Sequence, residues 1–203
     1  MTQAYADNID LWRFDGYSLF LHDDFAVNRL LNQTFPEFPL LRDVKHCITS
    51  GAGLADLWRY LVLWVYGGIY TDTDNAPGYN FTNGTIITDD VDSLFEVEMV
   101  GFPSQYFFAA SPRHPVMYFM VQQSIERLIQ VNGIATQYVP FTTGPGITKS
   151  ALIQVFGNRG DPDVDRGYPR KGTYFGPRCR QRLSKERDIF WTQQKGNDNN
   201  RKS

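Results

Sequence analysis

Residues 53–66 carry the clearest helical pattern in the chain. Ser50 and Thr49 offer capping hydroxyls before this stretch, and Gly67 and Gly68 end it. Its apolar residues occur on nearly every face of the expected helix: Leu54, Leu57, Trp58, Leu61, Val62, Leu63, Trp64 and Val65. A helix that is apolar all round is buried, so this pattern predicts a central helix inside the core.

Other helices and strands interleave with this one, with no visible repeat or linker. Helices are expected at residues 26–31, 115–131 and 147–156. Strands are expected at residues 17–21, 69–71, 95–102 and 106–110, with a turn around Pro103 and Ser104 between the last two. Little periodicity follows Gly157. The pattern predicts one α/β domain over residues 1–195 and a disordered tail at residues 196–203.

Composition excludes several classes of protein. The 203 residues are 42% hydrophobic and 21% charged, which excludes a disordered chain, a collagen-like fibre and a coiled coil. A formal net charge of -2 argues against nucleic acid as a partner, because phosphate-backbone binding needs clustered basic residues. No apolar run is long enough to span a membrane. Cys47 and Cys179 either pair or stay free.

Two aspartates follow the expected strand at residues 69–71. Residues two apart in a strand point the same way, so Asp72 and Asp74 are expected to present their carboxylates to one space. Two such charges repel by about 4 kcal/mol at 4 Å and an effective dielectric constant near 20. Mg²⁺ or Mn²⁺ removes that cost and suits carboxylates completed by water and phosphates. A polar turn would explain this tripeptide equally well.

Asp56 and Arg59 are charged residues within the apolar helix. They are three residues apart and so share one helix face. An intrahelical ion pair that satisfies itself is the simpler interpretation, because such pairs are common. The alternative is that the two side chains bind a polar ligand.

The order of these motifs resembles a known family. Asp56-x-x-Arg59, then Tyr66-Gly67-Gly68-Ile69-Tyr70, then Asp72-x-Asp74 is similar to the sugar-binding region of glycosyltransferases that contain the DXD motif. This family, glycosyltransferase family 32, includes yeast-type α-mannosyltransferases and α-1,4-galactosyltransferases. Residues 19–24, 109–115 and 143–145 also match, so the resemblance covers roughly Tyr17 to Leu152.

The resemblance implies a GT-A fold, which is Rossmann-like and binds a nucleotide sugar. It implies metal-dependent transfer of mannose, galactose or glucose, with retained anomeric configuration, from a UDP- or GDP-sugar to a glycan or glycolipid. Asp74 would hold Mn²⁺ or Mg²⁺, while Asp72 would contact the ribose or sugar and the metal through water; these two are the catalytic candidates. Asp56 and Arg59 would bind hydroxyls of the transferred hexose, and Tyr70 would line the same pocket.

The chain departs from the family pattern in two respects. It begins after the family's first strand, so the resemblance implies a GT-A fold without that strand and a membrane anchor, if any, in a segment absent from this chain. Family enzymes often add a third metal ligand near the C-terminus, frequently His. No His follows His114 in this chain, so Asp161, Asp163 or Asp165 would have to take that role.

The family resemblance implies the Golgi or another secretory lumen. The N-x-[ST] triplets at residues 32, 80 and 83 are potential glycosylation acceptors; a secretory location and chance occurrence explain them equally well.

Two rival functions remain. A non-catalytic remnant would keep the fold and bind nucleotide-sugar without turnover. A phosphatase of the haloacid dehalogenase type also places Asp-x-Asp after a strand, but Ala76 stands where those enzymes carry Thr or Val. Pro77 occupies the position of the central glycine in a calcium loop and excludes that site. His114 fits either ligand contact or a capped helix start, and the Gly144-Pro145 turn fits either ligand contact or an ordinary tight turn.

Overall fold

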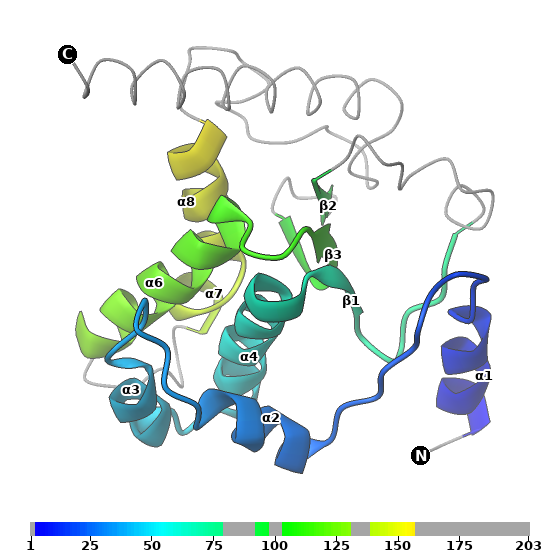
Figure 1. The fold of residues 1–203 in the computed structure, drawn as a ribbon, viewed down its shortest axis with the longest axis horizontal. Coiled ribbons are helices and arrows are strands. Elements are labelled where there is room, and N and C mark those ends of the chain that lie inside the picture. Colours follow the sequence, from blue (N-terminus) through cyan, green and yellow to red (C-terminus); the bar gives the residue numbers. More distant parts are fainter. Residues whose placement is uncertain (1–2, 79–91, 98–102, 131–138, 157–203) are drawn as a thin grey trace.

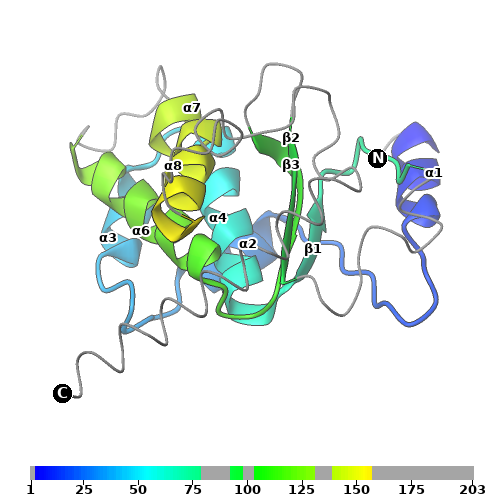
Figure 2. The ribbon, with the colours of Figure 1, turned by 90° about the horizontal axis from the view of Figure 1, so that it is seen from above.

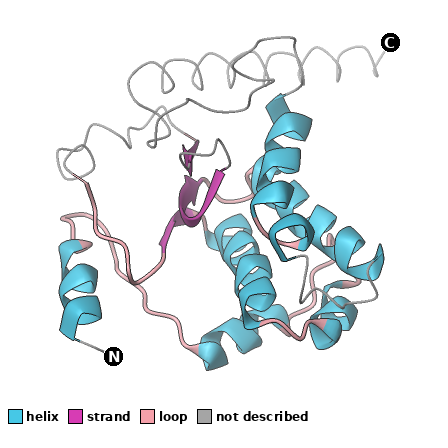
Figure 3. Ribbon diagram, turned by 180° about the vertical axis from the view of Figure 1, so that it is seen from behind, coloured by secondary structure: helices cyan, strands magenta, loops and turns pink. Residues whose placement is uncertain are grey.

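The computed structural model describes residues 3–78, 92–97, 103–130 and 139–156. Helices dominate this part of the chain, and three strands form one small sheet (Figures 1 and 3). The helices are α1 (Gln3–Leu11), α2 (Asp24–Leu31), α3 (Leu41–Cys47), α4 (Gly51–Tyr66), α6 (Pro115–Gln130), α7 (Val139–Thr142) and α8 (Pro145–Phe156), and the strands are β1 (Gly68–Thr71), β2 (Ser93–Val97) and β3 (Pro103–Ala110).

Several sequence predictions fall outside the described residues. These are the triplets at residues 80 and 83, the candidates Asp161, Asp163 and Asp165, Cys179 and the tail at residues 196–203. The single domain over residues 1–195 and the Cys47–Cys179 question therefore stay predictions. Within the described ranges, no helix is long and apolar enough to cross a bilayer.

The buried central helix predicted from the sequence is confirmed as α4. It begins two residues earlier than expected, and the Ser50 side chain accepts a hydrogen bond from the Gly53 N–H at 3.3 Å. Gly67 ends it with φ of 67°, and a Cβ there would lie 2.5 Å from Pro112 Cδ. Leu57, Tyr60 and Leu61 are fully buried. The helix therefore sits in the core, between the sheet and α6 (Figure 2).

The sheet has the strand order β1-β3-β2, and both neighbouring pairs are antiparallel. The mixed α/β class is confirmed, whereas the missing first strand of a GT-A fold stays a prediction. The turn expected around Pro103 and Ser104 is wrong, because β3 starts at Pro103, which pairs with Val97 of β2. Helices α4, α6 and α8 lie on one side of the sheet and α1 on the other (Figure 2).

The strand expected at residues 17–21 is also wrong. These residues form no strand, and the three described strands pair only with one another. Phe20 is 72% exposed, and Tyr17 and Leu21 are exposed as well. A β-prone run becomes a strand only where a neighbouring backbone supplies hydrogen-bond partners, and the described residues supply none here.

The other helices follow the predicted pattern closely. Asp23 caps α2 by accepting from the Ala26 N–H at 2.8 Å, so this helix begins two residues earlier than expected. Helix α6 is described as far as Gln130, so its expected last residue, Val131, lies outside the described residues; α8 begins at Pro145, two residues early. Helices α1 and α3 were not predicted, since neither carries a strong apolar period.

A row of aromatic rings crosses the sheet and fixes the position of Tyr70. Phe108 on the central strand is fully buried and faces Tyr70 of β1 and Phe95 of β2 in register. Its ring centroid lies 5.5 Å from that of Tyr70 and 5.9 Å from that of Phe95, both stacked. Cross-strand aromatic pairs of this kind stabilise a sheet, so β1 holds a fixed register beside α4.

His114 is a buried titratable group at the start of α6, and it predicts a pH-dependent stability. Its Nδ1 accepts the Val116 N–H at 3.2 Å, and burial lowers its pKa to about 4, against a smaller raising effect of Asp92. Below pH 6.5, His114 binds a proton in the unfolded chain but not in the folded chain. The free energy of unfolding therefore falls as the pH falls from 6.5 to 4. We expect this residue to contribute a loss of about 3 kcal/mol in the free energy of unfolding between pH 7.5 and pH 4.

Urea unfolding of His114→Asn across this pH range checks the prediction. Asparagine keeps a side-chain acceptor for the cap but does not titrate. The variant should lose less stability on acidification than the parent, by about 3 kcal/mol. Parallel pH profiles for the two proteins would contradict it.

Candidate active site

Asp72 is the first residue after β1, and it contacts both the sheet and α4. The Asp72 N–H donates to the Tyr106 carbonyl at 2.9 Å, which extends the pairing of β1 with β3 one residue beyond Thr71. The Tyr70 hydroxyl donates to Asp72 Oδ1, and Arg59 Nη1 lies 3.9 Å from the same oxygen. The Asp72 side chain is 34% exposed. One edge of its carboxylate is thus fixed by protein, and the residue stays open to solvent.

Arg59 of α4 lies at the centre of this group and is only 7% exposed. Its guanidinium donates to the Gln105 carbonyl, and its Nε donates to the Ala55 carbonyl at 3.4 Å. Its Nη2 lies 3.6 Å from Asp56 Oδ1, and its Cζ lies 4.8 Å from the centroid of the Tyr70 ring. Arg59 and Asp56 do form an ion pair within α4. This pair does not satisfy itself, because Arg59 also contacts residues of β1 and β3.

The surroundings of Asp56 shift the pKa of its carboxyl group. Burial raises its pKa from 3.8 to about 6, against the lowering effects of Arg59 and of a hydrogen bond that Thr143 Oγ1 donates to Asp56 Oδ2 at 3.0 Å. The negative charge of Asp72 raises it further. A shift of this size at a buried, paired carboxyl is typical of a functional site and also occurs in structural ion pairs.

A buried set of polar side chains supports Asp56 and Arg59 from behind. The Tyr60 hydroxyl donates to Gln105 Oε1 or the Thr143 carbonyl, and Gln105 Nε2 donates to Thr148 Oγ1 at 2.8 Å. Burial raises the pKa of Tyr60 well above its ordinary value. Gln105 and Tyr60 were missed by the sequence analysis. A lone amide in the apolar run of β3 is the signal that could have indicated Gln105.

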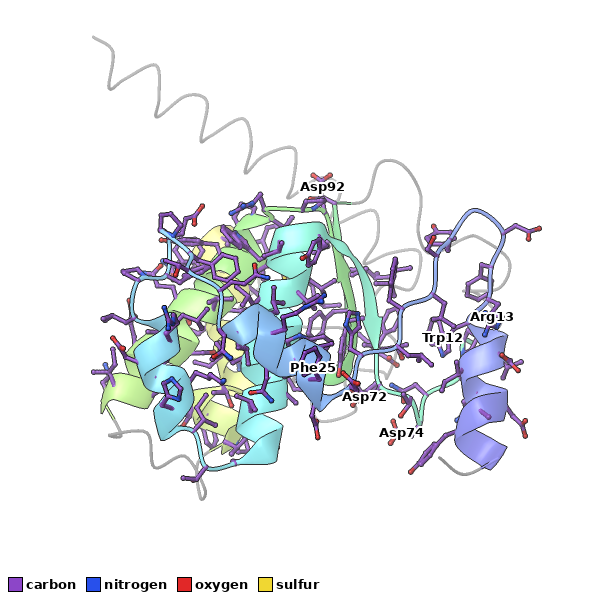
Figure 4. The ribbon with its side chains drawn as sticks, turned by 60° about the horizontal axis from the view of Figure 1, so that its bottom comes forward. Trp12, Arg13, Phe25, Asp72, Asp74 and Asp92 are labelled. Atoms are coloured by element: carbon purple, nitrogen blue, oxygen red, sulfur yellow. The ribbon has the colours of Figure 1, made fainter. Side chains whose placement is uncertain are left out.

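Asp74 does not join this group. The strand ends at Thr71, and the Asn75 N–H closes a turn by donating to the Asp72 carbonyl at 3.2 Å. The expectation that strand alternation aligns Asp72 with Asp74 is therefore wrong. Asp74 is exposed and lies farther along the loop towards α1 (Figure 4). Across the described ranges, no three His, Cys, Asp or Glu side chains gather as a metal site.

Comparison with known proteins bears directly on these residues. Residues 4–92 match the family model described as "Glycosyltransferase sugar-binding region containing DXD motif", and this range includes Asp56, Arg59, Tyr70, Asp72 and Asp74. The match is thus to a sugar-binding region within the chain. The resemblance predicted from the sequence is confirmed, and the DXD motif of this sugar-binding region is Asp72-Thr73-Asp74.

Two individual proteins resemble the chain more remotely. "Inositol phosphoceramide mannosyltransferase 1" of Schizosaccharomyces pombe is 27% identical over 118 residues, which cover 58% of this chain and 34% of that protein. The chain thus matches about a third of the length of this relative. The solved structure "PaToxG Glycosyltransferase" matches 70% of this chain and 46% of its own, with 17% identity and a TM-score of 0.42.

The donor set of the DXD loop fits a hard divalent cation in part. Asp72 Oδ1 is engaged by Tyr70, whereas no described residue hydrogen-bonds or pairs with Asp72 Oδ2 or with the Asp74 carboxylate. Mg²⁺ and Mn²⁺ are commonly held by one or two carboxylates together with water and substrate phosphates. Two available carboxylates on one loop meet that requirement, and no third protein ligand is needed for it.

Thr143, in the turn before α8, hydrogen-bonds Asp56 of the matched region, so removing its hydroxyl should lower the free energy of unfolding. Thr143→Val keeps the side-chain shape but removes the donor to Asp56, so we expect the free energy of unfolding at pH 7 to fall by about 2 kcal/mol. Thr143→Ser should retain most of the stability. The exposed Thr49→Val serves as the control and should change stability by less than about 0.5 kcal/mol. Denaturant unfolding of the three variants measures this, and equal stability of the Thr143→Val variant and the parent would contradict it.

Proposed function

We propose that this chain binds a nucleoside diphosphate sugar and transfers its hexose to a glycan or glycolipid, with metal dependence and retained anomeric configuration. One observation carries the proposal. Buried Asp56 and Arg59 meet Tyr70 and the partly exposed Asp72 where α4 and β1 converge, inside a region that matches the DXD family. A purely structural ion pair would not need to extend to an exposed carboxylate.

The chemistry of these side chains suits a sugar. A sugar hydroxyl both donates and accepts hydrogen bonds, and Arg59 offers donors within 3.6 Å of the acceptor Asp56. The Tyr70 ring lies beside Arg59 and gives a flat apolar surface. Because Arg59 is fixed by the Ala55 and Gln105 carbonyls, the group is organised before the ligand arrives. We therefore assign Asp56, Arg59 and Tyr70 to the hexose.

Asp72 and Asp74 would hold Mn²⁺ or Mg²⁺ against the donor diphosphate. Such a cation supplies Lewis-acid stabilisation of the charge that grows on the leaving diphosphate. In the structure the two carboxylates of Asp56 and Asp72 face the single guanidinium of Arg59, which leaves one negative charge uncompensated. A divalent cation at the adjacent DXD loop balances that charge and offsets the repulsion of a phosphate ligand.

The proposed hexose and acceptor rest on the name of the relative, and the proposed compartment rests on the family resemblance. Its name describes a mannosyltransferase acting on inositol phosphoceramide, which supports mannose as the hexose and a glycolipid as the acceptor. A secretory-pathway lumen such as the Golgi is the matching location. Asn32 of the Asn-Gln-Thr triplet is exposed at the end of α2, which is where a glycosylation acceptor must lie.

A second candidate is a remnant that binds nucleotide-sugar without turnover. Titration calorimetry with UDP- and GDP-hexoses plus Mn²⁺, followed by product analysis on the same samples, distinguishes the two. Metal-dependent binding with a released nucleoside diphosphate supports the transferase. Binding without product supports the remnant, and absence of binding contradicts both.

A further inference from the structure

The loop that carries the DXD motif is held from both sides. On the sheet side, Asn75 Nδ2 donates to the Tyr106 carbonyl at 2.9 Å, and the Asp72 N–H donates to the same carbonyl. The Asn75 N–H closes the turn onto the Asp72 carbonyl. These bonds fix the two ends of the turn but leave the backbone of Asp74 between them.

The other side of this loop is held by α1 and by Trp12, the residue just after its end. The Trp12 Nε1–H donates to the Asn75 carbonyl at 2.9 Å, and Asn8 Nδ2 donates to the Asp74 carbonyl at 3.3 Å. The Trp12 ring stacks on Phe107 of β3, with centroids 5.8 Å apart and planes inclined by 25°. Figure 4 shows Trp12 at the end of α1, beside the loop that carries Asp74.

These contacts cannot be explained by burial of α1 alone. The helix lies across the sheet from the helices of the core (Figure 2), and Tyr5 and Leu11 on it are exposed. Asn8 and Trp12 reach residues 66 and 63 positions later in the chain, both in the DXD loop. Helix α1 therefore attaches to the molecule in part through the loop that the proposed metal site uses.

We propose that Trp12 and Asn8 are positioning residues that hold Asp74 ready for its metal ion; this rests on the proposed function. Both donors engage main-chain carbonyls, so the Asp74 carboxylate itself is left to bind the cation. A loop ordered beforehand loses less conformational freedom when the ion binds. Without these two bonds, part of that ordering must happen at the moment of binding, and the affinity falls.

Three variants test this in the full chain. Trp12→Phe keeps a ring over Phe107 but removes the N–H donor, and Asn8→Ala removes an exposed donor with little risk to folding. Arg13→Ala is the matched control, because this exposed residue pairs only with Asp10 in the described structure. The measurements are the Mn²⁺ dissociation constant by titration calorimetry, amide hydrogen exchange at residues 72–75 without metal, and the thermal midpoint.

We expect Trp12→Phe to raise the Mn²⁺ dissociation constant about tenfold and Asn8→Ala to raise it severalfold, with faster exchange at residues 72–75 and with Arg13→Ala unchanged. Raising the Mn²⁺ concentration should restore turnover of both variants. A Mn²⁺ dissociation constant within twofold of the control overturns the positioning role, even if the thermal midpoint falls. If the parent and Arg13→Ala bind no Mn²⁺, the proposed metal site fails and the positioning role fails with it.

Discussion

Replacing Asp74 with Asn is expected to slow release of the nucleoside diphosphate from the sugar donor by roughly a thousandfold, or about 4 kcal/mol of transition-state stabilisation. The substitution removes one negative charge and leaves the side-chain size almost unchanged. Because Asp74 is exposed and outside the buried ion-pair group, folding should be unaffected. The loss should therefore appear in the turnover number and in Mn²⁺ affinity.

The control is Asp15→Asn. It removes the same charge from an exposed residue that precedes both α4 and β1 in the sequence. Steady-state kinetics at several Mn²⁺ concentrations, with thermal unfolding of each variant, separates chemistry from stability. Equal turnover of Asp74→Asn and Asp15→Asn would mean that Asp74 does not hold the metal. A lowered thermal midpoint in the Asp74 variant alone would instead show a structural role.

Replacing Arg59 with Met is expected to be the most destabilising of these changes. It removes the cation beside buried Asp56 and leaves that carboxylate without its ion-pair partner, which costs about 3–5 kcal/mol for a buried pair. The cost should be largest near pH 8 and smaller near pH 5. Because burial raises the pKa of Asp56 to about 6, this carboxyl is mostly neutral at pH 5 and then needs the cation less.

A double-mutant cycle at pH 8 measures this coupling. Asp56→Asn removes the buried charge, so the double variant with Arg59→Met should be more stable than the sum of the single changes predicts. Arg59→Lys should recover only part of the loss, because lysine cannot reproduce the planar donors that reach the Ala55 and Gln105 carbonyls. Additive changes would show that Arg59 does not stabilise Asp56.

Local signals in the sequence were enough to predict the part of the fold that carries the site. The apolar period, the Ser50 cap and the Gly67 stop define α4, and Ile69–Thr71 follow as a strand within one residue of the observed bounds. Asp56 and Arg59 meet because they are three residues apart on that helix. The strand spacing then indicated Asp72, and the family motif brought in Tyr70, which the aromatic row across the sheet places beside Arg59.

Most of the errors arise from contacts between distant segments, and one arises from a local turn. Residues 17–21 have strand propensity but no described neighbour to pair with, and Pro103 enters β3 because β2 pairs with it. Asp74 left the expected alternation because a turn, closed between Asp72 and Asn75, ends the strand early. Trp12, 63 positions before Asn75, has no sequence signal that connects it with the motif.

The most direct measurement is nucleoside diphosphate release from a panel of UDP- and GDP-hexoses by this chain, with Mn²⁺ and then with excess chelator. We expect release with at least one donor, loss of that release on chelation, and its recovery when Mn²⁺ is added back. The released sugar or glycoside should keep the α configuration of the donor. Release that continues undiminished in the presence of chelator would contradict metal-dependent transfer at Asp72 and Asp74.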